Sequence, residues 1–128
     1  MQVLLAQLSG QNEYVEAARA FCDFSIHEQT KTPKGLLYIE KFGTLCHAAN
    51  IAFVCLQVSL VLDTYHFSIP YSYLQQARLK AADVISSSFK EYHDFVQSQI
   101  HYMLGDSGRS YVIGFGENYP KQPYHAAR

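Results

Sequence analysis

The chain has 128 residues, of which 48% are hydrophobic and only 16% are charged, and its formal net charge is −1. This length and composition suit a single domain with a core of its own. The near-neutral charge excludes the basic surface of a nucleic-acid-binding protein, so no nucleic-acid partner is expected.

The N-terminal sequence MQVLLAQLSG has no basic residues before its short apolar run, so it is not a signal peptide. The longest apolar run, Ile51–Leu62, is interrupted by polar residues and is too short to span a bilayer, so no membrane partner is expected. The histidines show no HxxxH or HExxH pattern, and we expect no metal and no cofactor. The cysteines fit no metal spacing and are interpreted as buried small hydrophobic residues: Cys22, Cys46 and Cys55.

The first third of the chain predicts two helices and a loop. Residues 3–8 are typical of a buried helix that ends at Ser9 and Gly10. Asn12 is expected to cap a second helix, with apolar residues on one face, that runs to about Gln29. The sequence TKTPKG at 30–35 then predicts a loop, because proline and glycine interrupt helices.

The middle of the chain predicts a buried helix followed by an irregular stretch. After a short extended piece at 36–39, Thr44 is a good N-cap for a helix that is hydrophobic nearly all round. From Val58 to Gln76 the pattern matches neither a helix nor a strand, and we expect an insertion that loops out of this helix. Valine codons begin with GT and glutamine can be encoded by CAG, so the codons of Val58 and Gln76 can supply the usual GT and AG borders of an intron. A retained intron is therefore the working hypothesis for residues 58–76.

The last third predicts helices and an irregular C-terminal segment. Residues 76–84 are expected to be helical, and serines 86–88 offer N-caps for a final helix with an apolar face. Gly105 is a suitable residue to end that helix. The segment from Gly105 to Arg128 is rich in glycine, proline and aromatic residues, so it predicts a loop rather than a helix.

Several polar and aromatic residues have a structural interpretation. His47 and His101 lie on mostly apolar helix faces and are expected in the core, as are Tyr38 and Tyr111. Glu117 is expected to be a solvated loop carboxylate. Within the C-terminal loop, a local ion pair is expected between two further residues, Asp106 and Arg109.

Three segments carry a family resemblance: LLAQLSGQNEYVEAARAFCDF, TKTPKGLLYIEKFGTLCHAANIAF and QSQIHYMLGDSGRSYVIGFGENYPKQPYH. In their order and motifs they resemble the family 9 glycoside hydrolases, and they are most similar to the animal cellulases. GRSYVIGFGENYP is the most specific of these motifs. The resemblance implies an all-α fold, a partial (α/α)6 barrel of about four or five helices with an irregular C-terminal loop. On this resemblance, residues 1–128 are expected to be a fragment of one catalytic domain.

The resemblance also implies a reaction. Family 9 enzymes are inverting endo-β-1,4-glucanases: one carboxylate activates water and a second carboxylic acid protonates the leaving oxygen. In the family the base lies in an Asp-Ala-Gly-Asp motif and the acid is a Glu well beyond the tail motif. This sequence contains no such Asp-Ala-Gly-Asp, so we expect the chain to lack both carboxylates and to be inactive alone. The implied partner is cellulose and the implied location is extracellular, whereas no oligomeric state is implied.

The sugar-binding positions implied by the resemblance all differ from the family residue. Where the family reads KWGTLRHAA, Phe42 replaces the Trp that stacks on glucose, and Cys46 replaces an Arg that donates to sugar hydroxyls. Where the family reads P-H-H-R, Tyr124 and Ala126 replace the cleft His and Arg. A one-residue shift would bring His125 to the family's active-site position, which makes it the single catalytic candidate.

Two further functions remain open beside an incomplete cellulase. The first is a non-catalytic module that binds glucan weakly through Phe42, Tyr124 and His125. The second is a remnant helical protein with no binding role, whose uncovered apolar helix faces would cause aggregation.

Overall fold

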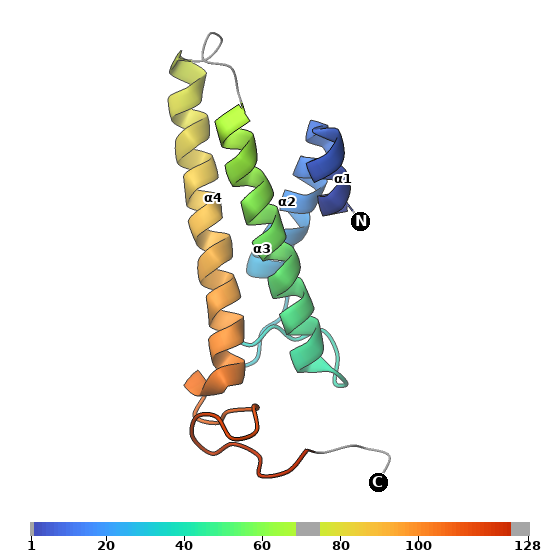
Figure 1. Cartoon of the computed structure of the whole chain (residues 1–128), viewed down its shortest axis with the longest axis vertical. Helices are drawn as coiled ribbons and strands as arrows, with labels where there is room; N and C mark the ends of the chain where they lie inside the picture. The colour runs from blue at the N-terminus through green and yellow to red at the C-terminus, as the bar shows by residue number, and fades with distance from the viewer. Residues whose placement is uncertain (1, 69–74, 124–128) are drawn as a thin grey trace.

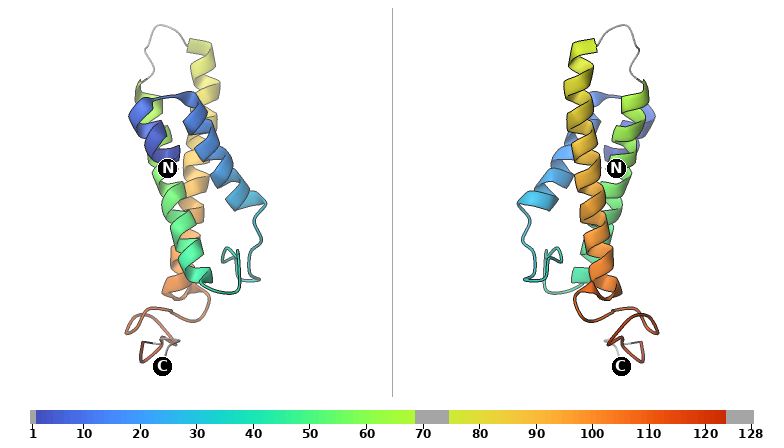
Figure 2. Two further views of the ribbon diagram at one scale, coloured as in Figure 1. Left: turned by 90° about the vertical axis from the view of Figure 1, so that its right-hand side faces the viewer. Right: turned by 90° about the vertical axis from the view of Figure 1, so that its left-hand side faces the viewer.

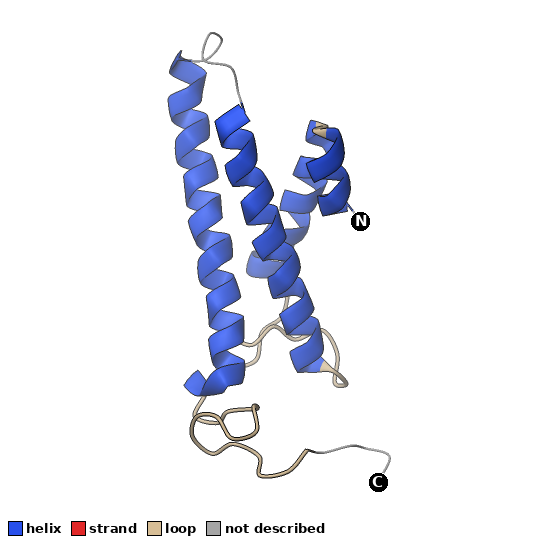
Figure 3. Ribbon diagram, in the orientation of Figure 1, coloured by secondary structure: helices blue, strands red, loops and turns tan. Residues whose placement is uncertain are grey.

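The computed structural model describes residues 2–68 and 75–123, and along the long helices it describes the side chains of residues 2–62 and 87–123. In chain order the elements are α1 (Gln2–Ser9), α2 (Asn12–His27), α3 (Thr44–Ser68), α4 (Gln75–His101) and the π-helical turn η1 (Tyr102–Asp106). Over these residues no strand is formed, and the only β pairing is an isolated bridge between Lys31 and Leu37. The predicted all-α class is therefore confirmed (Figure 3).

The two long helices determine the arrangement. α3 and α4 run antiparallel and side by side, and they share the most extensive helix contact (Figure 1). α1 and α2 form a helical hairpin whose helices both contact α3, and α2 also reaches α4 (Figure 2). The loop at 28–43 and the segment at 107–123 lie at the same end of the α3–α4 pair (Figure 1).

The turn between α1 and α2 lies at Gly10 as predicted, but the N-cap of α2 is not the predicted residue. Gly10 ends α1 with a φ of 66°, which glycine adopts without a Cβ clash, and its N–H donates to the Ala6 carbonyl. The N-cap of α2 is Gln11, in an extended conformation and without a side-chain cap hydrogen bond, and Asn12 is already helical. The expected Asn12 cap was wrong by one residue, because the glycine turn lets the next helix begin immediately.

The expectation that residues 58–76 loop out of this helix was wrong over its first half, because α3 continues as a helix to Ser68. That these residues are an insertion from a retained intron stays a prediction. Val58, Val61 and Leu62 are buried, and with Cys55 they follow the three- and four-residue spacing of a helix face. Their β-branched propensity disfavours a helix only slightly, so packing against the neighbouring helices decides the conformation. Residues 69–74, which include Pro70, lie outside the described residues.

α4 joins what the sequence divided into two helical pieces. Residues 75–101 form one continuous helix, so serines 86–88 lie inside it rather than capping a new one. The helix propensity of serine is only moderately low, and the long contact with α3 outweighs it. At the far end Gly105 has a φ of 133° within η1, which confirms the glycine-dependent end of this helical segment.

One described helix is long and apolar enough to cross a bilayer, by length and composition only: the stretch Thr44–Leu62 of α3. The prediction considered only the shorter run Ile51–Leu62. Within this stretch Ala48, Ala52 and Cys55 are buried in the core, and 39% of the stretch is buried in total. The same test selects such core helices, so the finding gives only weak support for a membrane span.

The core lies where α2, α3 and α4 meet, and two polar side chains enter it. Tyr92 of α4 is fully buried, and its Oη donates to Asp23 Oδ1 of α2 at 2.5 Å. Burial raises the pKa of Tyr92, and the hydrogen bond to Asp23 raises that pKa further. Gln99, about two turns further along α4, is 1% exposed. The main apolar members are Val15, Ala18, Cys22, Ile26, Leu36, Leu37, Ala48, Cys55, Val58, Val61, Leu62 and Phe95.

Candidate functional site

The loop at 28–43 is a folded platform at the end of the helix pair. Inside it, the Thr32 N–H donates to the Leu36 carbonyl at 2.7 Å, and the Tyr38 N–H donates to the Thr30 carbonyl at 2.9 Å. Gln99 joins this platform to α4, since it accepts from the Leu37 N–H at 2.8 Å. The same side chain donates to the carbonyl of Gly35 at 3.1 Å. A single buried side chain on α4 therefore fixes the position of the loop.

The last residues of this loop are attached to the first turn of α3. Thr44 Oγ1 donates to the Glu40 carbonyl at 2.9 Å, and His47 Nε2 lies 2.9 Å from Glu40 Oε1. Gly43 has a φ of 71°, and its carbonyl accepts from the His47 N–H. This attachment leaves Phe42 projecting outward, with 83% of its surface exposed.

Cys46 follows on the same first turn of α3 and is also exposed. Its sulfur accepts a hydrogen bond from Asn50 Nδ2 at 3.6 Å. The structure thus brings Phe42 and Cys46, both predicted to face sugar, to one exposed segment. The other predicted site residues lie outside the described residues: Tyr124, His125 and Ala126.

The C-terminal segment folds as a compact loop beneath α4. Ser110 is fully buried, with its N–H donating to the Glu117 carbonyl at 3.0 Å. The Tyr111 N–H donates to the Met103 carbonyl of η1 at 2.9 Å, and Asn118 Nδ2 donates to the Gly108 carbonyl at 3.1 Å. The predicted irregular loop is confirmed, and its backbone is held by specific hydrogen bonds.

The aromatic and apolar side chains of this loop point largely to solvent. Tyr111 stacks on Tyr102 with ring centroids 6.1 Å apart, and burial raises the pKa of Tyr111, as does the neighbouring Tyr102. The residues that remain between 41% and 51% exposed are Tyr111, Val112, Ile113, Phe115 and Tyr119. The loop therefore offers flat apolar surface next to polar backbone groups, a combination that suits a sugar ring.

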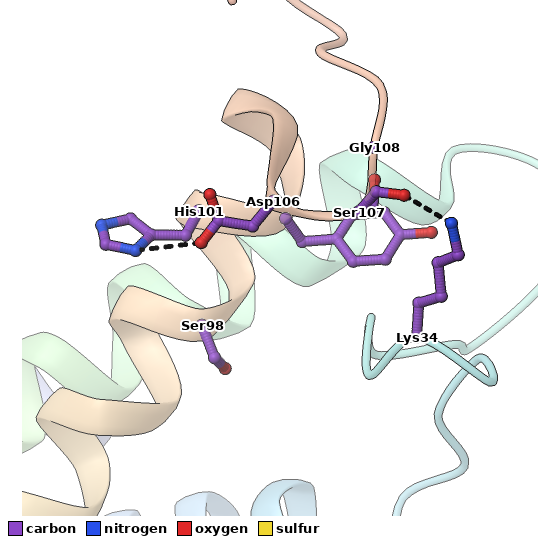
Figure 4. A pocket seen from close by; sticks show the side chains of 7 residues that line it. Lys34, Ser98, His101, Asp106, Ser107 and Gly108 are labelled. Carbon is purple, nitrogen blue, oxygen red and sulfur yellow. Dashed lines mark hydrogen bonds and ion pairs between the residues drawn. The ribbon is translucent and has the colours of Figure 1, made fainter. Parts of the chain in front are cut away.

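A depression of about 520 Å³ lies between the loop at 28–43 and the end of α4. Lys34 Nζ donates to the Ser107 carbonyl at 2.5 Å on one side of it (Figure 4). On the other side His101 Nδ1 faces Asp106 Oδ2 at 3.5 Å. The full lining is Lys34, Ser98, His101, Tyr102, Asp106, Ser107 and Gly108.

This depression can bind polar groups but does not have the catalytic set of a glycosidase. Asp106 is the only carboxylate among the residues that line it, whereas glycoside hydrolysis uses a pair. Asp106 and His101 are 73% and 56% exposed, so their ion pair contributes little to stability. Within the described residues no group of three or more His, Cys, Asp or Glu could hold a metal ion.

Several expected structural roles were wrong. His101 is exposed, and His47 is partly exposed and pairs with Glu40, so neither is a core histidine. Tyr38 and Tyr111 are 37% and 41% exposed rather than buried. These four residues belong to the loop at 28–43, the first turn of α3, the last residue of α4 and the segment at 107–123, which lie at one end of the helix pair (Figure 1). At such an end the apolar pattern of a helix no longer implies that a neighbouring element covers the side chain.

Two further expectations changed at charged and sulfur-containing residues. Asp106 pairs with His101 instead of Arg109, and the Arg109 guanidinium lies 5.9 Å from the centre of the Tyr111 ring. Among the cysteines, the interpretation as buried residues is correct for Cys22 and Cys55, whereas Cys46 is exposed.

Sequence reasoning missed the residues that hold the site together. Gln99 was passed over, although a glutamine between apolar residues on the core face of α4 is the pattern of a buried polar tether. Lys34 carried no signal, since a loop lysine usually points to solvent and its partner Ser107 lies far away in the sequence.

Comparisons with known proteins agree with one another. A family model described as glycosyl hydrolase family 9 matches residues 1–128. Endoglucanase A of Bacillus pumilus is 33% identical over 97% of this chain and 17% of its own length, and endoglucanase B of Cellulomonas fimi is 34% identical over 95% and 10%. The solved structure of an endoglucanase from the termite Nasutitermes takasagoensis is 40% identical, with a TM-score of 0.74 over 97% of this chain and 23% of the termite chain. The chain thus spans less than a quarter of each of these proteins.

Proposed function

The chain belongs to glycosyl hydrolase family 9, and we propose that it forms one wall of a β-1,4-glucan-binding cleft without supplying a catalytic carboxylate. Its helices make up part of an (α/α)6 barrel, the fold of the termite enzyme. The observation that carries the proposal is the 83% exposure of Phe42, on a loop whose backbone is fixed on both sides. An exposed aromatic ring on a rigid support is a stacking platform for a sugar face.

The same proposal limits what the chain does alone. By resemblance the base belongs to an Asp-Ala-Gly-Asp motif that this sequence does not contain, and Glu117 does not match the position of the family's acid. We therefore infer that residues 1–128 release no reducing sugar from carboxymethylcellulose. Measurable release by the purified chain would refute this inference. By resemblance the site of action is extracellular, where cellulose is found.

The outer faces of the helical hairpin support the idea that these residues are part of a larger barrel. Large apolar side chains on α1, α2 and α3 remain exposed, and a groove of about 220 Å³ between these helices is lined mainly by apolar side chains. The clearest examples are Leu4, Leu8, Phe21, Phe24 and Phe53. Surface of this kind is normally covered in a folded protein, here by further helices of the barrel. If it stays uncovered, the remnant helical protein remains the alternative, and aggregation of the purified chain is its expected sign.

Glucan binding can be tested with a single tryptophan as a fluorescent reporter. The chain contains no tryptophan, so Phe42→Trp introduces a single indole at the proposed platform and restores the family residue. Titration with cellopentaose is expected to change the emission of this indole. The variant should bind the sugar about fivefold more tightly than wild type, because the larger ring adds roughly 1 kcal/mol of stacking. Wild-type binding is measured in parallel from its tyrosine fluorescence.

The matched control places the same reporter elsewhere on α3. Phe53 is 62% exposed and lies away from the first turn of that helix, so Phe53→Trp is expected to show no response to the sugar. If the two variants respond alike, or if Phe42→Trp shows no response at millimolar sugar, the proposed platform is refuted.

A further inference from the structure

Residues 40–43, the segment that carries Phe42, fold around the ring of His47 on the first turn of α3. His47 Nε2 lies 2.9 Å from Glu40 Oε1, and the His47 N–H donates to the Gly43 carbonyl at 3.0 Å. The ring also covers one side of Gly43, since a Cβ built on that glycine would lie 3.6 Å from His47 Nε2. His47 therefore contacts the segment at both of its ends, and the exposed Phe42 lies between them.

The contact between His47 and Glu40 is a directed hydrogen bond. An ionised carboxylate can only accept, so Nε2 is the nitrogen of the His47 ring that donates to Glu40. A second hydrogen bond, from Thr44 Oγ1 to the Glu40 carbonyl at 2.9 Å, holds the main chain of the same residue. Glu40 is thus fixed at its main chain and at its side chain, and the side-chain bond depends on His47.

We propose that His47 is a positioning residue for the Phe42 ring, which it orders through Glu40. The side chains of His47 and Glu40 are 36% and 60% exposed, and exposed pairs of this kind contribute little to the free energy of unfolding. Their effect is local. The bond limits the conformations of a short segment whose aromatic side chain, 83% exposed, gains little order from packing.

An ordered aromatic ring binds a ligand more tightly than a mobile one, because the conformational entropy is lost before the ligand arrives. This effect on affinity rests on the proposed glucan platform, whereas the ordering of Phe42 by His47 does not. A rival role for the same contact is to start α3, since a carboxylate beside the N-terminus of a helix is favourable. Loss of a contact with that role would speed hydrogen exchange at the first hydrogen-bonded amides of α3, those of residues 48–51.

The test uses the full chain with Phe42→Trp, because the natural sequence has no tryptophan and the indole then reports on position 42 alone. The fluorescence anisotropy of this indole, excited where tyrosine does not absorb, measures its mobility before any sugar is added. We expect His47→Ala and Glu40→Ala each to lower the anisotropy and to weaken cellopentaose binding about fivefold, through lost preorganisation. The two substitutions together should have no larger effect than either alone, because both remove the same hydrogen bond.

Conservative variants and a matched control separate positioning from a general effect. In His47→Gln the side-chain amide can replace Nε2 as the donor, and in Glu40→Gln the amide oxygen remains an acceptor, so both variants should keep most of the parent anisotropy. His27→Ala is the matched control, because His27 forms a similarly exposed pair with Glu91 at 3.2 Å, between α2 and α4. Its loss should leave the anisotropy and the affinity unchanged.

The outcomes distinguish the positioning role from the proposed platform. Unchanged anisotropy in His47→Ala, an equal loss in His27→Ala, no rescue by either glutamine variant, or faster exchange at residues 48–51 would overturn the positioning role. If the parent Phe42→Trp does not bind cellopentaose but its anisotropy depends on His47 and Glu40 as expected, the positioning role stands and the glucan platform fails. Urea unfolding checks that each variant folds. Should His47→Ala not fold, Glu40→Ala, which alters only the exposed loop, tests the same bond.

Discussion

The two hydrogen bonds by which Gln99 tethers the loop at 28–43 to α4 can be tested with the variant Gln99→Leu. Gln99 is 1% exposed, accepts from the Leu37 N–H and donates to the Gly35 carbonyl. Leucine has a similar volume but can make neither hydrogen bond. The substitution thus removes the tether while leaving the core of α4 filled.

The expected cost follows from the burial of the two backbone groups. Leu37 is fully buried, so its N–H has no access to water once the glutamine is removed, and such an unsatisfied donor costs about 1–3 kcal/mol. Gly35 is exposed and its carbonyl can be hydrated again, which limits that loss to about 1 kcal/mol. The apolar surface of the new leucine offsets about 1 kcal/mol. We expect the free energy of unfolding to fall by about 2 kcal/mol.

Urea unfolding followed by circular dichroism measures this cost, and amide hydrogen exchange locates it at the Leu37 N–H. Gln97→Leu is the matched control, because Gln97 lies on the same helix but is exposed, and its replacement is expected to change stability by less than about 0.5 kcal/mol. If Gln99→Leu costs no more than Gln97→Leu and the Leu37 amide keeps its protection, the tether does not hold the loop.

The remaining predictions concern the core and the C-terminal loop. Burial raises the pKa of Tyr92 in the folded state, so the contribution of Tyr92 to the free energy of unfolding is fully present below the unfolded pKa of about 10 and is lost as pH rises above that value. Tyr92→Phe should therefore reduce the loss of stability at alkaline pH, measured by urea unfolding at several pH values. An unchanged alkaline loss would contradict the assignment. Gly114 and Gly116 have φ values of 75° and 74°, so alanine at either costs about 1–2 kcal/mol locally. At Gly116 a Cβ would also meet the Leu104 carbonyl oxygen at 2.9 Å, whereas Gly114 has open space. Gly116→Ala should therefore weaken exchange protection at the Tyr111 N–H more than Gly114→Ala does, and equal effects would count against the packing of this loop.

The helices could be predicted from the sequence where local signals and packing agree. Gly10 marks a real helix end, because its effect acts through the adjacent backbone. Thr44 lies at a real helix start, but the predicted cap was wrong by one residue: Thr44 is already helical, and its hydroxyl donates to the Glu40 carbonyl instead of accepting from a helix N–H. The conformation after Val58 was predicted wrongly, since Val58 and Val61 disfavour a helix only weakly and the gain from their burial against the neighbouring helices is larger. Local propensity carries no information on that gain.

The candidate site could be predicted only in part, for a different reason. The resemblance identified Phe42 and Cys46, and both are exposed on one rigid segment. The residues that hold this segment act across long sequence separations: Gln99 lies 62 positions from Leu37, and Ser107 lies 73 positions from Lys34. A single sequence gives the chemical type of such residues but not their partners.

The exposure of positions 42 and 46 changes how their departures from the family pattern should be interpreted. A side chain that is 83% exposed contributes little to the core, so Phe42 in place of a tryptophan alters the surface that we propose to bind glucan and leaves the fold intact. The same holds for the exposed Cys46 in place of an arginine, where hydrogen-bond donors are lost rather than core packing. Substitution at these two exposed positions should therefore carry little stability cost. If the proposed platform is correct, the double variant Phe42→Trp/Cys46→Arg should gain affinity for cellopentaose without a change in the free energy of unfolding, and a loss of stability in that variant would contradict this reasoning.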